Sequence, residues 1–128
     1  MPPECASCAM GLLFTRPSRY LPHKHYDVFV EALPSQRGRV IAITGTSSGI
    51  GMEAARAVVR TGGNVLCLNR PSEHASASVR KLQSECADGA AATGVACDLQ
   101  DVSSVMSAAD VIRQHVRSTG LHPHKQCR

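Results

Sequence analysis

The chain has 128 residues, of which 43% are hydrophobic and 19% are charged, and its formal net charge is +4. This length allows one domain at most, and the composition is typical of a globular chain rather than a disordered one. Lysines and arginines are scattered without long runs, so no nucleic-acid partner is expected. No apolar stretch approaches the ~18 residues of a membrane-spanning helix, so we expect no transmembrane segment.

The first 37 residues are expected to form a poorly structured extension with one short helix. Five prolines interrupt this segment, and the helix is predicted between Lys24 and Leu33, where apolar residues recur at helical spacing. Cys5 and Cys8 have the C-x-x-C spacing of zinc and redox sites. No histidine pair with zinc-finger spacing accompanies them, and the segment lacks the strand and helix of a redox motif. We therefore expect no metal site.

Three further cysteines fall in elements that are predicted to be buried. Cys67 and Cys97 lie in predicted strands, and Cys86 lies on the apolar face of a predicted helix. Such cysteines usually behave as small hydrophobic residues, which fits a reducing compartment better than a disulfide framework. We expect a cytoplasmic protein, with an organellar location as the alternative.

A strand, a glycine-rich turn and a helix follow one another directly after the extension. The apolar run from Val40 to Ile43 is typical of a strand that is buried on both faces of a parallel sheet. Gly45, Gly49 and Gly51 follow, and a helix is predicted from Met52 to Arg60. In a dinucleotide-binding turn, the glycines permit the tight turn, the approach of a pyrophosphate and close helix packing. The helix N-terminus then offers unpaired N–H groups to the anion.

This turn has two alternatives to a dinucleotide site. A P-loop requires a lysine directly after its last glycine, whereas Met52 follows Gly51 here. A glycine-rich turn without any ligand is the second alternative. The spacing of three glycines after a buried strand favours a nucleotide site over packing alone.

The remainder of the chain repeats the strand–helix pattern twice. Gly62 or Gly63 is expected to end the first helix, and Gly89 the second. The predicted strands and helices are Asn64–Asn69, Glu73–Asp88, Thr93–Cys97 and Asp101–Arg117. The fold class is therefore α/β, as one β-α-β-α-β-α half of a Rossmann-like, doubly wound parallel sheet with strand order 3-2-1. Residues 38–117 are predicted to form this partial domain, and residues 118–128 an irregular tail.

The apolar positions of the three helices predict which faces meet the sheet. For the first helix they are Ile50, Ala54, Ala57 and Val58. For the second helix they are Ala75, Val79, Leu82 and Cys86. For the last helix they are Val102, Val105, Met106, Ala109, Ile112 and Val116, and Asp101 lies at its N-terminus.

The turn resembles the cofactor motif of the short-chain dehydrogenase/reductase family. From Thr44 to Gly51 it reads Thr-Gly-Thr-Ser-Ser-Gly-Ile-Gly, with a Gly-x-x-x-Gly-x-Gly spacing. The resemblance covers roughly residues 38–117 and implies that the turn binds a nicotinamide dinucleotide. The cofactor-binding residues expected in the turn are Gly45, Thr46, Ser47, Ser48, Gly49, Ile50 and Gly51.

The end of the second strand is expected to select the cofactor. NAD-binding folds place an acidic residue there, which accepts a hydrogen bond from the ribose 2′-OH. This chain has Asn69 and Arg70 instead, and a guanidinium can pair with a 2′-phosphate in bidentate fashion. The sequence thus favours NADP(H) over NAD(H), with Arg70 as the phosphate partner and Asn69 and Ser72 as helpers. The alternative is that Arg70 is a solvated turn residue.

Asp98 and Leu99 resemble the segment of the family that binds the adenine ring. The resemblance implies that Asp98 accepts a hydrogen bond from the adenine amino group and that Leu99 packs near the ring. The alternative is that Asp98 caps the turn that follows it.

The family's chemistry implies a Ser, a Tyr and a Lys that this chain is not expected to contain. By resemblance, a Tyr whose pKa is lowered by a Lys exchanges a proton with the substrate oxygen, and a Ser holds that oxygen. Tyr20 and Lys24 have the Tyr-x-x-x-Lys spacing, but they precede the glycine turn, and Pro22 between them opposes a helix. We therefore expect no catalytic residue and no activity of this chain alone.

Three interpretations follow for the chain as a whole. It is expected to be the cofactor-binding portion of an NADP(H)-dependent oxidoreductase that stops before the catalytic residues. The alternatives are a non-catalytic nucleotide-binding module and a fragment without independent function. In each case the first strand would have one unpaired edge, which could mediate self-association.

Overall fold

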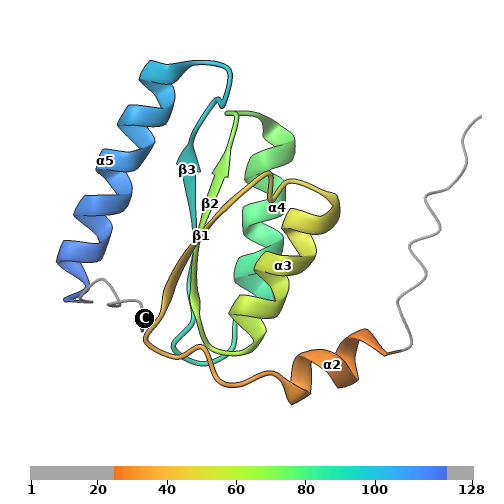
Figure 1. Cartoon of the computed structure of the whole chain (residues 1–128). Coiled ribbons are helices and arrows are strands. Elements are labelled where there is room, and N and C mark those ends of the chain that lie inside the picture. Colours follow the sequence, from red (N-terminus) through yellow and green to blue (C-terminus); the bar gives the residue numbers. More distant parts are fainter. Residues whose placement is uncertain (1–24, 121–128) are drawn as a thin grey trace, which may run out of the picture.

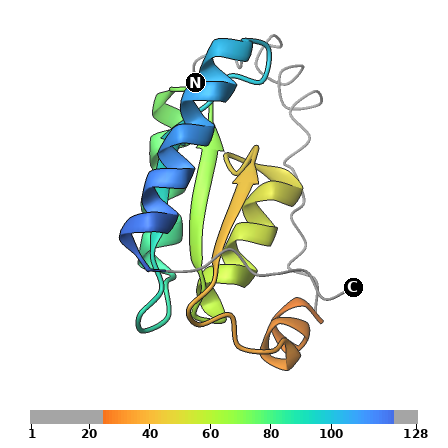
Figure 2. The same cartoon turned by 60° about the vertical axis from the view of Figure 1, so that its left-hand side comes forward.

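The computed structural model describes residues 25–120, which form a parallel sheet flanked by helices (Figure 1). Helices α3 and α4 cover one face of the sheet, and α5 lies alone on the other (Figures 1 and 2). The elements are α2 (Tyr26–Ala32), β1 (Val40–Thr44), α3 (Gly49–Arg60), β2 (Asn64–Asn69), α4 (Glu73–Ser84), β3 (Ala92–Ala96) and α5 (Val102–Ser118).

The sheet confirms the predicted fold class and strand order. Its three strands are parallel, in the order β1-β2-β3, with β2 in the centre. Ile41 pairs with Val65 across the first ladder, and Val65 pairs with Ala92 across the second. All three strands therefore end at the same edge of the sheet, where the loops that follow them come together.

Side chains of β2 alternate between two hydrophobic clusters, one on each face of the sheet. Val65 and Cys67 point toward α3 and α4, where they pack with Leu82. Leu66 and Leu68 point the other way, into a smaller cluster beneath α5. The core is thus thickest under the two-helix face.

Strand β1 corrects one expectation, because it is not buried on both faces. Val40, Ile41 and Ile43 are half-buried, whereas Ala42 and Thr44 are exposed. The apolar run predicted a central strand, but among the described residues β1 is an edge strand with a single neighbour. The unpaired edge that the sequence analysis predicted is therefore present.

The buried face of α3 also differs from the prediction. Its buried residues are Met52, Ala55 and Val59, and Ile50 is 91% exposed. Gly51 fixes this rotation, because it packs against the end of β1 and therefore turns residues four and eight positions later toward the sheet. Of the predicted apolar stripe, Val58 packs partly against the core cluster, whereas Ile50 and Ala54 are exposed.

On α4 the prediction holds in part, since Ala75 and Leu82 are buried and Val79 packs beside them. The helix, however, ends at Ser84 rather than at Asp88. The N–H of Ala87 donates instead to the carbonyl of Val59 on α3, at 3.0 Å, which draws the chain out of the helical path.

Along α5, only Ala108 is buried, and Ile112 packs partly against the cluster beneath it. Val102 is 78% exposed and Met106 is 57% exposed, because among the described residues the sheet does not extend beyond β1 to meet them. Asp101 lies at the helix N-terminus as expected, and its carboxylate also caps the helix by accepting a hydrogen bond from the N–H of Ser103 at 2.9 Å.

The remaining bounds agree closely with the sequence. Strand β3 is shifted by one residue from the predicted range, so that buried Cys97 directly follows it. Gly62, with φ of +90°, provides the left-handed residue after α3. Within residues 25–120, no helix combines the length and the apolar character needed to cross a bilayer.

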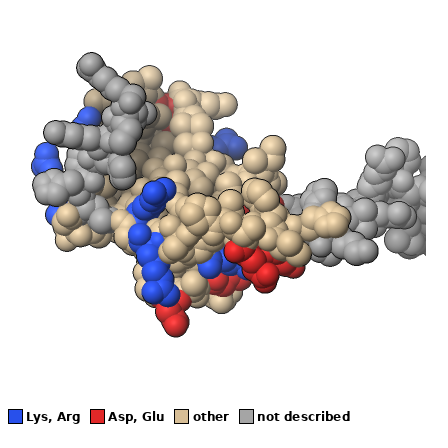
Figure 3. Space-filling view, turned by 60° about the horizontal axis from the view of Figure 1, so that its bottom comes forward, with Lys and Arg blue, Asp and Glu red and all other residues tan. Residues whose placement is uncertain are grey.

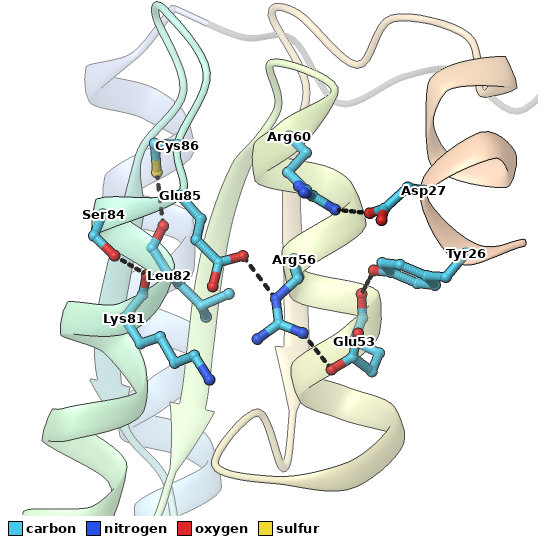
Figure 4. Close-up of polar contacts among 10 residues, drawn as sticks. All are labelled: Tyr26, Asp27, Glu53, Arg56, Arg60, Lys81, Leu82, Ser84, Glu85 and Cys86. Carbon is cyan, nitrogen blue, oxygen red and sulfur yellow. Dashed lines mark hydrogen bonds and ion pairs between the residues drawn. The ribbon is translucent and has the colours of Figure 1, made fainter. Parts of the chain in front are cut away.

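Helix α2 is held against α3 by polar contacts that continue to α4 (Figure 4). The Tyr26 hydroxyl donates to the Glu53 carbonyl at 2.9 Å, and Arg60 pairs with Asp27 at 2.7 Å. Arg56 reaches the other way, with its Nε 2.7 Å from a carboxylate oxygen of Glu85. The Nε–H bond is poorly aligned with that oxygen, so the contact is chiefly ionic.

A cavity of about 600 Å³ lies beside these contacts, at the end of the sheet where the strands begin. Asp27, Glu31, Arg37 and Arg60 are among its lining residues. Figure 3 shows this end of the molecule, where basic and acidic groups of the described residues lie next to one another. The described residues that line the cavity include both acidic and basic side chains, so the cavity has no excess of one charge that would select an ionic ligand.

Replacing Leu82 by Ala should lower the free energy of unfolding by about 2–5 kcal/mol, because it opens a cavity where α4 meets the sheet. Val111→Ala is the matched control, since Val111 is 46% exposed, and it should change stability by less than about 0.5 kcal/mol. Urea unfolding of the full chain measures both values. Equal losses would contradict the assigned core.

Candidate functional site

The glycine-rich loop connects the carboxyl end of β1 to the N-terminus of α3. Gly45 and Gly49 have φ of +68° and +60°, a region that other residues seldom adopt. The N–H of Gly45 donates to the carbonyl of Leu68 at 3.1 Å, which extends the β1–β2 ladder into the loop. The loop therefore turns sharply at both ends while its first residue stays fixed to the sheet.

Gly51 allows α3 to start directly against this turn. A Cβ atom at this position would lie 2.2 Å from the Gly45 carbonyl oxygen and 3.1 Å from that of Thr44. Both neighbours are backbone atoms and cannot give way without moving the loop. The close helix packing that the sequence predicted for Gly51 is therefore confirmed.

The N-terminus of α3 is open toward an anion. Ser48 is the N-cap residue, its side chain makes no capping hydrogen bond, and the first turn carries no acidic residue. Backbone N–H groups in that turn lack intrahelical partners, and the helix dipole places partial positive charge there. Ser47, Ser48 and Gly49 also line a cavity of about 620 Å³ together with His74 and Lys81. A phosphate is the kind of group that this end of the helix can hold.

Thr46 faces into the protein, although the sequence places it among the cofactor contacts. It is fully buried, and its Oγ1 accepts a hydrogen bond from Asn69 Nδ2 at 2.8 Å. Burial raises the pKa of the Cys67 thiol, and a hydrogen bond with the Thr46 side chain opposes that rise. The buried side chain of Thr46 thus connects the glycine loop to the end of β2 through its hydrogen bond with Asn69. Its contact with a cofactor stays a prediction.

The end of β2 carries the predicted selectivity residues beside a pocket. Arg70 is exposed, and with Asn69 and Ser72 it lines a pocket of about 360 Å³ between β2, β3 and α4. Ser72 is the N-cap of α4, and its Oγ accepts from the N–H of Ala75 at 3.1 Å. The hydroxyl hydrogen of Ser72 remains available to a ligand. The roles of Asn69, Arg70 and Ser72 in binding a cofactor stay predictions.

Asp98 and Leu99 follow β3 at the same edge of the sheet. The Asp98 carboxylate accepts from the N–H of Gln100 at 3.0 Å, and its own N–H donates to Ser104 Oγ at 2.9 Å. Asp98 therefore caps its turn, which was the alternative interpretation. One carboxylate oxygen remains for a ligand, and Leu99 is 66% exposed. The roles of Asp98 and Leu99 in binding an adenine ring stay predictions.

The hydrogen bond between Thr46 and Asn69 was not predicted from the sequence. The two residues are 23 positions apart, and no spacing rule relates them. Cys5, Cys8, Tyr20 and Lys24 lie outside the described residues. Within residues 25–120 no group of histidines, cysteines and acids is placed to hold a metal ion. The N-terminus of α3 offers the unpaired N–H groups and the positive dipole end that suit a phosphorylated ligand.

Comparison with known proteins gives one family. The sequence profile described as short chain dehydrogenase matches residues 39–121. D-threitol dehydrogenase of Mycolicibacterium smegmatis is 36% identical over 75 residues, which are 59% of this chain and 28% of that protein. An uncharacterized oxidoreductase of Mycobacterium bovis is 33% identical over 76 residues, covering 59% of this chain and 22% of that protein. The chain thus spans less than a third of the length of these curated relatives.

Solved structures show the same likeness. A short-chain type dehydrogenase/reductase from Mycobacterium ulcerans has a TM-score of 0.59 at 26% identity, over 62% of this chain and 29% of that one. The NADPH-dependent 3-quinuclidinone reductase of Rhodotorula rubra has a TM-score of 0.56 at 28% identity, over 84% and 36%. L-sorbose reductase from Gluconobacter frateurii, solved with NADPH and L-sorbose, has a TM-score of 0.52 at 27% identity, over 66% and 30%.

Replacing Gly51 by Ala should destabilise the protein by about 1–3 kcal/mol, because the new methyl group overlaps the Gly45 carbonyl. Gly94→Ala is the control, since a Cβ there would meet only Val79, at an ordinary 3.5 Å. The control should change stability by less than about 1 kcal/mol. Thermal unfolding compares the two variants, and a Gly51→Ala protein as stable as the control would refute the close approach.

Proposed function

The chain belongs to the short-chain dehydrogenase family, and from this premise we propose that it is the NADP(H)-binding portion of an oxidoreductase. Enzymes of this kind transfer a hydride between the nicotinamide ring and a carbonyl or alcohol substrate. The observation that carries the proposal is the position of Arg70. Arg70 is exposed at the end of β2, directly after Asn69, whose side chain is hydrogen-bonded to Thr46 of the glycine loop.

The pyrophosphate is proposed to bind at the loop and the first turn of α3. Gly49 leaves open space above the backbone, because a Cβ there would meet nothing within 4 Å. The N-cap Ser48 and the exposed Ile50 frame this space. The residues proposed to hold the dinucleotide are Gly45, Thr46, Ser47, Ser48, Gly49, Ile50, Gly51, Asn69, Arg70, Asp98 and Leu99.

Preference for NADP(H) rests on charge at the end of β2. Neither Asn69 nor Arg70 carries a negative charge that would repel a 2′-phosphate. The Arg70 guanidinium can donate two hydrogen bonds to that phosphate. The 3-quinuclidinone reductase and the sorbose reductase to which the chain is similar are NADPH enzymes by their descriptions, which supports the same choice.

We propose that the matched segment supplies cofactor binding without proton transfer. The sequence contains two tyrosines, and Tyr20 lies outside the described residues. Tyr26 donates to the backbone of α3 and precedes the matched residues 39–121. Binding of NADPH without turnover is therefore the behaviour expected of this chain. A non-catalytic binding module would behave in the same way.

Fluorescence titration of the full chain should show NADPH binding, and Arg70→Asp should weaken it about tenfold or more. NADH binding should change much less, since the unphosphorylated ribose offers the guanidinium no anion. Arg39→Asp is the matched control. It makes the same charge change directly before β1, at the opposite end of the sheet from Arg70. Equal losses for both cofactors, or an equal effect of the control, would refute the role of Arg70.

The free edge of β1 is proposed to mediate self-association. Its exposed Ala42 lies beside unpaired backbone groups of an edge strand, which can pair with another chain. Ala42→Lys should reduce concentration-dependent association in sedimentation velocity. Ala54→Lys, on the exposed side of α3, is the control and should leave association unchanged. A monomeric parent chain would contradict this proposal.

A further inference from the structure

Two hydrogen bonds fix which backbone groups of β1 face its neighbour in the sheet. The Arg39 carbonyl accepts from the N–H of Asn64 at 2.9 Å, and the N–H of Gly45 donates to the Leu68 carbonyl at 3.1 Å. The N–H and C=O groups of one strand residue point to the same side, and those of the next residue point to the opposite side. The odd-numbered residues of β1 therefore direct their backbone groups to β2.

The even-numbered residues of β1 direct the same groups to the free edge. They are Val40, Ala42 and Thr44, and among the described residues no strand lies beyond β1 to receive their hydrogen bonds. Charged residues and prolines commonly keep an edge strand from pairing, and β1 contains neither. The edge is therefore open to a strand whose own N–H and C=O groups have the matching spacing.

We propose that β1 pairs with β1 of a second copy, in antiparallel orientation about a two-fold axis at Ala42. This inference rests on the self-association proposed above and names the partner strand and its register. Ala42 then lies opposite Ala42 of the second copy, and Val40 lies opposite Thr44. Every outward-facing residue exchanges both of its hydrogen bonds, about six bonds in all. An axis at Ile41 or Ile43 would leave one outward-facing residue of each strand without a partner.

The side chains of β1 are compatible with this register. Ile43 packs against the cluster under α3, and Ile41 lies on the same face of the strand. The two-fold axis places Ile41 opposite Ile43 of the second copy, and β-branched pairs of this kind stabilise antiparallel strands. On the other face, the small side chain of Ala42 meets its own copy at the axis. No charge lies opposite a like charge within the paired strands.

Strand β3 forms the opposite edge of the described sheet and is less suited to pairing. Gly94 is at its centre, where it offers no side chain for a contact across strands and weakens the strand. The N–H of Cys97 donates to the Asn69 carbonyl at 2.9 Å, so the N–H of Ala96 points away from β2. Ala96 thus provides a matched position on the edge that is not proposed to pair.

Replacing Ala42 by proline removes an outward N–H and leaves the ladder to β2 intact, because an edge strand tolerates proline at such a position. Ala42→Pro should weaken self-association by about tenfold or more in sedimentation equilibrium of the full chain, with an unchanged circular dichroism spectrum. Ala96→Pro is the matched control and should leave association unchanged. Association that survives Ala42→Pro would refute the β1 pairing while the proposed self-association stands. A monomeric parent chain would refute both.

Hydrogen exchange of the parent chain tests the register when Ala42→Pro does not fold. The amides of Val40, Ala42 and Thr44 should be protected only at concentrations where the dimer forms. Those of Ile41 and Ile43, which face β2, should be protected at every concentration. Unprotected even-numbered amides in the dimer would overturn the inference. So would their protection in the monomer, since another segment of the same chain would then cover the edge.

Discussion

The contact between Gly51 and the Gly45 carbonyl sets the geometry of the whole described structure. Because no side chain separates them, α3 begins directly on the turn that ends β1. This contact also fixes the rotation of the helix, so Ala55 and Val59 face the sheet and form the centre of the larger cluster. The same packing leaves the first turn of α3 with its N–H groups directed outward. The absence of a side chain at Gly51 therefore determines both how α3 packs on the sheet and where the N-terminus of α3 lies.

A second constraint connects the two halves of the site. The loop after β1 would be free to move relative to the end of β2 if only the strand ladder joined them. The hydrogen bond between Thr46 and Asn69 restricts that freedom, and its Thr46 side is fully buried. The glycine loop is therefore tied to the end of β2 by a side-chain contact as well as by the strand ladder.

Apolar surface remains uncovered along β1 and α5. Ala42 on the edge strand and Val102 and Met106 on the helix are all exposed. The curated relatives that the chain matches are three to five times its matched length. Among the described residues, both elements therefore present apolar side chains to solvent.

The sequence by itself determined the parallel α/β fold, the strand order and the glycine turn, because these depend on local patterns. Apolar runs define strands, and glycines mark the positions where φ is positive or where the backbone comes close. The strand bounds agree within one residue for the same reason.

Only the tertiary structure decided which faces are buried and which polar groups meet. Apolar spacing on α3 is compatible with two neighbouring stripes, and the contact at Gly51 selected one of them. The end of α4 depends on a hydrogen bond from Ala87 to Val59 of another helix. The inward turn of Thr46 depends on Asn69, which lies 23 positions away. Such contacts form between segments that are distant in the chain, and no local pattern records them.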